Sequence, residues 1–221
     1  TFEHCLCLWI IQSGKKQNGV LFMCGILGSI KRYFDETTLN LIKHRGPDDF
    51  GIDSFEVNGH DVHLGQRRLS IIDLSPAGHQ PMISSCKNFS LIFNGEIYNF
   101  KTLRAQLEAK GYKFRSNSDT EVLLYGLIEW GTACFDKLEG MFTGAFVDTK
   151  TEEAILFRDH LGIKPLFYTQ HNDTLAFSSE IKGLRPVLDT FSLNEDALHE
   201  HFTANPLYSK HYKVSKFFIL F

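Results

Sequence analysis

Met23-Cys24-Gly25-Ile26 places a cysteine directly behind a methionine, at the start of an apolar segment. As a first residue, Cys24 would carry a thiol with an ordinary pKa of about 8.5 and a free α-amine with an ordinary pKa of about 7.7 to 8.0. Such an amine is partly unprotonated at neutral pH, so it can act as a base for the thiol beside it. Twenty-two residues precede Met23, and while they remain attached the nitrogen of Cys24 is a peptide amide without basic character. The stretch therefore predicts a nucleophile that depends on removal of the residues before it.

Short apolar segments dominate the chain after this stretch. Strands are predicted at residues 26–30, 62–67, 89–93, 141–147, 153–157, 166–169 and 174–177. Residues 148–151 and 170–173 join consecutive strands and are typical of hairpin turns. Leu39 and Ile42 predict a brief helix, which Gly46-Pro47 ends.

Two longer helices have recognisable ends. The first begins with Asn99 as N-cap and ends at Gly111. In the second, Ser118 and Glu121 have the spacing of a capping box, and Gly131 ends the helix. Many short strands around two such helices favour an α+β sandwich with mainly antiparallel sheets.

The composition is that of a globular chain without a basic partner surface. The 221 residues are 43% hydrophobic, and their net charge of −3 gives no electrostatic footprint for nucleic acid or an anionic membrane. The apolar run at 5–11 is shorter than the roughly 20 residues that span a bilayer, and Glu3 before it does not fit a secretory signal. We therefore expect a cytoplasmic protein that binds neither nucleic acid nor membrane.

The cysteines and histidines form no pattern typical of a metal site. Five cysteines stand at positions 5, 7, 24, 86 and 134, without a Cys-x-x-Cys pair. Their odd number disfavours a disulfide framework and fits a reducing compartment. The ten histidines are scattered along the chain. We expect no metal in this domain, one reactive thiol at Cys24 and four structural cysteines.

Four further motifs follow the first stretch in order. They are His44-Arg45-Gly46-Pro47-Asp48, Arg68-Leu69-Ser70-Ile71-Ile72-Asp73, Phe93-Asn94-Gly95-Glu96-Ile97-Tyr98-Asn99 and Ser118-Asp119-Thr120-Glu121. The set resembles the glutaminase domain of glutamine-hydrolysing asparagine synthases, a class II glutamine amidotransferase, and residues 141–142, 158–166 and 178–182 extend the resemblance over about 23–190. Pro47-Asp48 and the run 94–99 favour this branch over amidotransferases that act on sugar phosphates or phosphoribosyl pyrophosphate. The resemblance implies an N-terminal-nucleophile fold, an αββα sandwich.

The resemblance also implies catalytic roles for three residues. Cys24 would attack the side-chain amide of L-glutamine as a thiolate, form a thioester and release ammonia. The side-chain amide of Asn94 and the backbone N–H of Gly95 would stabilise the oxyanion. Taken without the other motifs, Cys24 reads as a buried structural cysteine, and Asn94-Gly95 reads as an ordinary hairpin turn.

The substrate's charged groups would bind to a second set of residues. By resemblance, Arg68 holds the α-carboxylate and the backbone of Leu69, Ser70, Ile71 and Ile72 lines the site. Asp119 and the segment at Glu96 would receive the α-ammonium. The local alternatives are surface charges at Arg68 and Glu96 and a helix-dipole acid at Asp119. His44 would belong to a structural wall rather than to a Cys-His pair, and Arg45 would form ion pairs.

The motifs divide the chain into three parts. Residues 1–23 form an upstream extension or removable prefix, 24–200 the glutaminase domain, and 201–221 a truncated or irregular tail. The sequence lacks the Ser-Gly-Gly-x-Asp-Ser loop of a synthetase domain and a Walker-type loop. ATP and Mg²⁺ are therefore expected only for a C-terminal synthetase domain, present in cis or in trans. The alternatives are a silent glutamine-binding or interaction module with blocked Cys24, and an N-terminal-nucleophile hydrolase acting on another amide.

Overall fold

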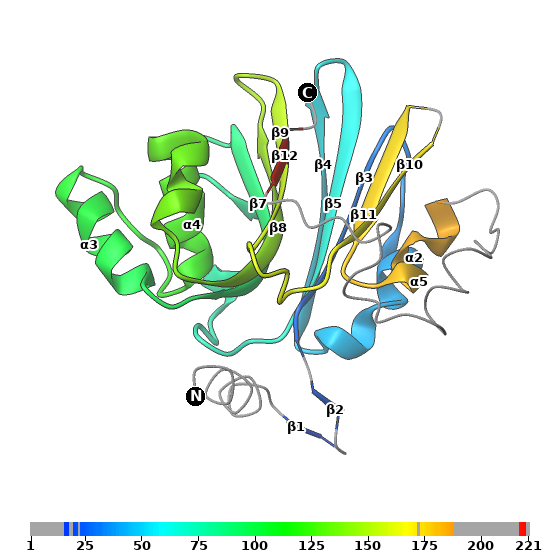
Figure 1. Ribbon diagram of the computed structural model, residues 1–221, viewed down its shortest axis with the longest axis horizontal. Helices are drawn as coiled ribbons and strands as arrows, with labels where there is room; N and C mark the ends of the chain where they lie inside the picture. Colours follow the sequence, from blue (N-terminus) through cyan, green and yellow to red (C-terminus); the bar gives the residue numbers. More distant parts are fainter. Residues whose placement is uncertain (1–15, 18–19, 22, 172, 188–216, 220–221) are drawn as a thin grey trace.

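Two five-stranded antiparallel sheets lie face to face, with helices on both outer faces (Figure 1). The computed structural model describes residues 16–17, 20–21, 23–171, 173–187 and 217–219. The αββα sandwich expected from the sequence is confirmed. The predicted boundary between residues 200 and 201 lies outside the described residues. Among the described residues, no helix has the length and apolar composition needed to cross a membrane.

The first sheet carries the residue after Cys24 on a central strand. Its order is β10 (Phe167–His171), β11 (Thr174–Ser178), β3 (Gly25–Ile30), β5 (His60–Arg68) and β4 (Asp49–Val57). Gly25 pairs with Arg67, so Cys24 lies beside the end of β5, at Arg68 and Leu69. This pairing brings the first and third motifs together.

The second sheet carries Asn94 and Gly95. Its order is β12 (Phe217–Ile219), β9 (Glu153–Arg158), β8 (Gly140–Asp148), β7 (Phe89–Ile97) and β6 (Met82–Ile83). A separate pair is formed by β1 (Lys16–Gln17) and β2 (Val20–Leu21). Because β6 is paired only as far as Leu91, the later residues of β7 leave one strand edge open toward the site.

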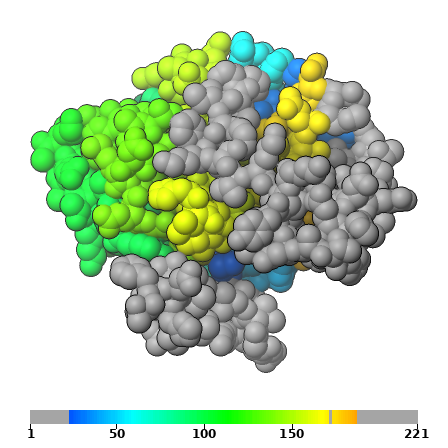
Figure 2. Space-filling model, viewed as in Figure 1, coloured from blue at the N-terminus to red at the C-terminus, as the bar shows by residue number. Residues whose placement is uncertain are grey.

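Helices cover the two outer faces. In Figure 1, α3 (Phe100–Ala109) and α4 (Asp119–Trp130) lie over the second sheet, and α2 (Glu36–Asn40) and α5 (Ile181–Leu184) lie on the side of the first. The α3 and α4 residues, in green, form one end of the molecule (Figure 2). Short 3-10 helices complete the described part of the fold: η1 (Lys43–Arg45), η2 (Pro76–Gly78), η3 (Gly131–Lys137) and η4 (Arg185–Val187).

Apolar side chains fill the space between the sheets. Ile26 and Leu64 of the first sheet pack with Ile92 and Leu156 of the second, and all four are fully or almost fully buried. A second cluster joins the outer face of the second sheet to α3 and α4 through residues such as Leu123. Burial on both sides of the second sheet fixes the position of β7, because a one-residue slip would turn its apolar side chains to the wrong layer.

The predicted strands are all present, with ends that extend by up to four residues, and both hairpins are confirmed. Strand β4 was not predicted, because Asp49, Gly51 and Asp53 are residue types depleted in strands; it lies at a sheet edge.

The capping box predicted at the start of α4 is half formed. Ser118 Oγ accepts from Glu121 N–H at 3.2 Å, but the Glu121 carboxylate binds the N–H groups of residues 115 and 116 instead of the N-cap.

Candidate active site

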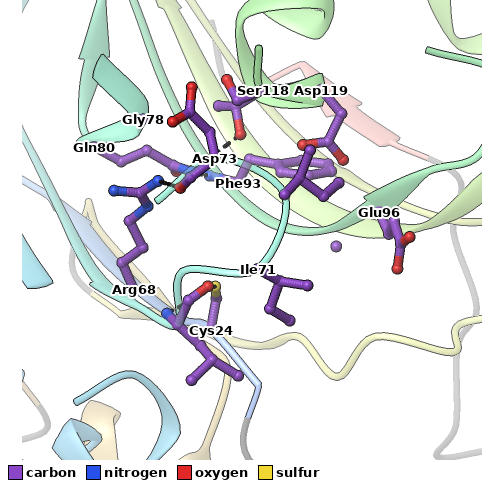
Figure 3. A pocket seen from close by; sticks show the side chains of 14 residues that line it. Cys24, Arg68, Ile71, Asp73, Gly78, Gln80, Phe93, Glu96, Ser118 and Asp119 are labelled. Atoms are coloured by element: carbon purple, nitrogen blue, oxygen red, sulfur yellow. Dashed lines mark hydrogen bonds between the residues drawn. The ribbon is translucent and has the colours of Figure 1, made fainter. Parts of the chain in front are cut away.

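One pocket brings together most of the predicted site residues. Its wall includes Cys24, the segment after β5, the second half of β7 and the first turn of α4. In Figure 3, Arg68 and Glu96 lie on opposite sides of the pocket, with Cys24 and Ile71 below and Asp119 above. The predicted residues that line it are Cys24, Arg68, Leu69, Ile71, Ile72, Gly95, Glu96 and Asp119.

The Cys24 thiol lies against the main chain of Leu69. Leu69 N–H donates to Cys24 Sγ at 3.3 Å, and Sγ lies 3.5 Å from Leu69 O. Burial raises the pKa of the Cys24 thiol, whereas the Leu69 N–H and the positive charges of Lys164 and Arg68 oppose that rise. The sulfur is thus held at the pocket wall by a donor that stabilises a thiolate.

The turn at His44-Arg45 holds the main chain of Cys24. Arg45 Nε donates to Cys24 O at 3.0 Å, and Arg45 Nη1 forms an ion pair with Glu180 Oε1 at 3.1 Å. His44 Nε2 lies 2.8 Å from the same carboxylate oxygen, and Lys182 Nζ lies 3.0 Å from Glu180 Oε2. The ion pair expected for Arg45 is confirmed, and His44 contacts Glu180 rather than the thiol.

The N–H of Gly95 faces the pocket. Gly95 pairs with Phe142 of β8, but Phe142 N–H donates to Asp159 Oδ2 at 3.1 Å and Phe142 O accepts from Asp159 N–H at 2.7 Å. Neither main-chain group of Phe142 therefore faces β7, and Gly95 belongs to a non-hydrogen-bonded pair whose N–H points away from β8.

The neighbouring N–H groups confirm this direction. Phe93 N–H donates to Gln80 Oε1 at 2.7 Å and Ile97 N–H donates to Asp119 Oδ2 at 3.0 Å, and both acceptor residues line the pocket. Gly95 N–H lies between these two donors on the same strand edge. A side chain at Gly95 would collide with the main chain of β8, so glycine is required at this approach.

Asn94 lies behind the pocket wall. Its side chain is 1% exposed, and its Nδ2 finds no hydrogen-bond partner within the described part of the chain. Buried amide donors are ordinarily paired. An unpaired donor next to Gly95 is consistent with a group reserved for a substrate, although Asn94 itself is not part of the lining.

Two carboxylates form the opposite part of the pocket. Asp119 is the first residue of α4 and is 5% exposed. Burial raises the pKa of Asp119 to about 6, and the charge of Glu96 adds to that rise. Burial also raises the pKa of Glu96, which Lys164 opposes. A cation bound beside these two carboxylates would stabilise their ionised forms.

Arg68 lines the pocket and also holds the loop that contains Asp73 and Ser75. Its guanidinium donates to the main-chain oxygens of Asp73 and Ser75, the latter at 3.2 Å. Any side chain at Gly78 would strike the guanidinium. Asp73 Oδ1 accepts from Ser75 N–H at 2.8 Å and Oδ2 from Asn117 N–H at 2.9 Å. These bonds tie the loop to the segment before α4.

The lining also includes residues to which the sequence assigned no role in substrate binding or catalysis. Ser118 and Thr120 stand beside Asp119 in its motif, and Phe93 and Asp73 also stand inside predicted motifs. Gln80 had no local signal, since it lies in a segment of irregular structure. Ser70 does not line the pocket, and its N–H donates to Asp48 Oδ2 at 2.9 Å. No group of His, Cys, Asp and Glu that could hold a metal is found in the described ranges.

Comparisons with known proteins place this pocket in a family. Residues 23–218 match the family described as glutamine amidotransferase domain. The chain is 40% identical over 173 residues to asparagine synthetase [glutamine-hydrolyzing] 3 of Bacillus subtilis, covering 73% of this chain and 27% of that protein. It is 39% identical over 178 residues to asparagine synthetase B of Escherichia coli, covering 76% and 31% respectively. The chain thus spans about a third or less of these relatives.

A solved structure supports the same fold. The glutamine phosphoribosylpyrophosphate amidotransferase of B. subtilis superposes with a TM-score of 0.56 at 23% identity, over 73% of this chain and 43% of the other. At that identity the likeness concerns the fold. With the sequence relatives and the pocket taken together, the chain belongs to the glutamine amidotransferase domain family, in the branch of the glutamine-hydrolysing asparagine synthetases.

Proposed function

We propose that the pocket hydrolyses L-glutamine to glutamate and ammonia. The Cys24 thiolate attacks the carbon of the side-chain amide and the C–N bond breaks. The leaving nitrogen takes up the proton that the thiol lost, and ammonia is released. Water then hydrolyses the thioester, which returns glutamate and regenerates the thiol. One glutamine and one water are consumed for each glutamate and ammonia.

The main support for this proposal is that one pocket holds a thiol together with a guanidinium and two carboxylates. L-Glutamine is a zwitterion with an amide at the far end of its side chain. Arg68 is the cation for its α-carboxylate, and Asp119 with Glu96 are the anions for its α-ammonium. Both charged groups of glutamine are bonded to its α-carbon, so Arg68 and the two carboxylates would bind that end of the substrate while its side-chain amide extends to Cys24.

Gly95 and Asn94 are the proposed oxyanion donors. The N–H of Gly95 faces the pocket from an open strand edge, and Asn94 Nδ2 is a buried donor without a partner among the described residues. Donors that are fixed before the reaction stabilise the developing charge without reorganising. Their arrangement supports an acyl-transfer reaction rather than simple glutamine binding.

We infer that full activity requires Cys24 to be the first residue. The α-amine would take the thiol proton and pass it to the leaving ammonia. While Met23 is attached, the Cys24 nitrogen is an amide and cannot do this. The expected loss is about 10² to 10⁴ in rate, the ordinary range for general acid–base catalysis.

The ammonia acceptor belongs to another part of the enzyme in this proposal. Full-length relatives named as asparagine synthetases are more than three times as long as the matched region. We infer a synthetase domain, in cis or in trans, that uses ATP and Mg²⁺ to activate aspartate. No residue of this chain is assigned to those ligands.

A protease site tests the proposal directly. Residues 18–23 are replaced by the recognition sequence of a protease that cuts immediately before Cys24, and the chain is folded before cleavage. Glutamate release from L-glutamine is then measured before and after the cut. Cys24→Ala, cleaved in the same way, serves as the matched control.

We expect a rise of about 10² or more on cleavage, absent from the control. Equal turnover before and after the cut would refute the amine as base, and turnover by Cys24→Ala would remove Cys24 from the mechanism. Inactivity of the cleaved, folded chain together with retained glutamine binding would favour the silent binding module.

A further inference from the structure

Lys164 is a buried cation behind the nucleophile. It lies in the loop after β9 and is 5% exposed. Its Nζ donates to Met23 Sδ at 3.2 Å, and within the described residues this thioether is the partner found for it. A thioether is a weak acceptor, whereas buried lysines ordinarily pair with a carboxylate. The ammonium is therefore poorly compensated at its present position.

The main chain, not the ammonium, fixes Lys164. Asp159 accepts from the N–H groups of Ile163 at 2.9 Å and Lys164 at 3.1 Å, besides that of Phe142. Arg158 Nε donates to Lys164 O at 2.6 Å. The Asp159 carboxylate is thus already engaged by three N–H donors, and the loop keeps its shape without help from the Lys164 charge.

The positive charge of Lys164 lowers the pKa of the Cys24 thiol. Among the charged groups that act on the Cys24 thiol, Lys164 has the largest effect and favours the thiolate; Asp119 opposes ionisation and Arg68 supports it. On Lys164 itself, burial lowers the pKa, Cys24, Glu96 and Asp159 raise it, and Arg45 lowers it further.

We propose that Lys164 is a positioning residue for the nucleophile, whose fixed ammonium beside Met23-Cys24 favours the thiolate of Cys24. This inference deepens the proposed function and rests on Cys24 being its nucleophile. The same positive charge would disfavour protonation of an α-amine at Cys24, because like charges repel. One lysine would thus favour both the thiolate and the neutral amine, the two forms that the reaction uses.

The test measures thiolate formation at Cys24 in the intact chain, where the amine is blocked. The full chain is treated with iodoacetamide between pH 6 and 10, and the alkylation rate of each cysteine is followed by peptide mass spectrometry. Trypsin places Cys24, Cys86 and Cys134 on separate peptides, 17–31, 69–87 and 116–137. Exposed Cys86 is the reactivity control, and buried Cys134 reports unfolding.

Three variants separate charge from structure. Lys164→Met removes the charge and keeps the apolar stem, Lys164→Arg keeps the charge, and Lys182→Met removes a nearby lysine whose side chain is 49% exposed. Lys164→Gln replaces Lys164→Met if alkylation of Cys134 shows that the latter unfolds.

We expect Lys164→Met to slow Cys24 alkylation at pH 7.5 by about 3- to 10-fold and to move its rate–pH profile to higher pH, with Cys86 unchanged. Lys164→Arg should keep the wild-type profile, and Lys182→Met should change the rate by less than about 2-fold. An unmoved profile in the folded uncharged variant would overturn the inference. So would a slower rate with the same pH midpoint, or a Lys164→Arg profile equal to that of Lys164→Met.

These results do not depend on glutamine turnover. A cleaved chain without glutaminase activity would count against the proposed function, while the alkylation profile of Cys24 would still decide the role of Lys164.

Discussion

Asp119→Asn should stabilise the empty protein at neutral pH. The substitution keeps the shape of the side chain and its acceptor for the Ile97 N–H, but it removes a charge from a site that is 5% exposed. Burial raises the pKa of Asp119 from about 3.8 to about 6. A rise of about 2 units, at 1.36 kcal/mol each, corresponds to roughly 3 kcal/mol of unfavourable ionisation in the folded state.

The sign of the pH dependence follows from the raised pKa. The native state binds the Asp119 proton more tightly than the unfolded state, so the wild-type free energy of unfolding falls as pH rises from about 4 to about 6 and then levels off. The free energy of unfolding of Asp119→Asn should not fall in this way, because asparagine does not ionise. The variant's advantage over the wild type should be about 0.5 kcal/mol at pH 4 and roughly 3 kcal/mol at pH 7.5, because the raised pKa already includes the favourable effect of the helix N-terminus on the charge.

Urea unfolding at pH 4 and pH 7.5, followed by circular dichroism, measures this difference. Asp136→Asn, an exposed acid beyond the other end of α4, is the matched control and should change stability little at either pH. An Asp119→Asn advantage that is the same at both pH values would show that ionisation of Asp119 does not lower stability, and so would a variant that is destabilised at pH 7.5.

The other predictions concern turnover and the pocket loop. Asn94→Ala should lower glutaminase kcat by about 10² to 10³ while costing less than about 2 kcal/mol of stability, because Nδ2 has no partner to lose among the described residues; unchanged kcat would make it a structural residue. Arg45→Met should lower kcat more than it raises KM, because Arg45 holds the carbonyl of Cys24; a change confined to KM would contradict this. Gly78→Ala should displace the Arg68 guanidinium and weaken glutamine binding by about 10-fold in calorimetry, an effect of about 1.4 kcal/mol; wild-type affinity would place the α-carboxylate elsewhere.

Local sequence signals predicted the elements better than the contacts between them. The helix ends at Ser118 and Gly131 depend on neighbouring residues, so capping chemistry identified them. The edge strand β4 escaped prediction because it is formed by pairing with β5 in spite of its Asp and Gly residues. Strand pairing is a property of the whole sheet, which a single-segment pattern does not contain.

The same distinction holds in the site. The order of the motifs was sufficient to assign Cys24, Arg68 and Asp119 to one site. Three different parts of the chain bring these residues to one pocket. The direction of the Gly95 N–H depends on the contact between Phe142 and Asp159, which are 17 residues apart in sequence, and it could not be read from Asn94-Gly95 alone. Lys164 lay inside a motif of the resemblance, but only the folded chain places its ammonium against Met23.

Glutamine bound in the pocket should hold its side-chain amide at Cys24. Labelling with a diazoketone analogue of glutamine measures this position, because the diazo carbon takes up a proton and the Cys24 thiolate then displaces dinitrogen from it, forming a stable thioether. The chain cleaved before Cys24 should gain one analogue on the peptide that begins at Cys24, excess L-glutamine should prevent the labelling, and Arg68→Ala should slow it. Labelling that glutamine does not prevent, or that occurs equally at Cys86, would show that the amide of bound glutamine does not lie at Cys24.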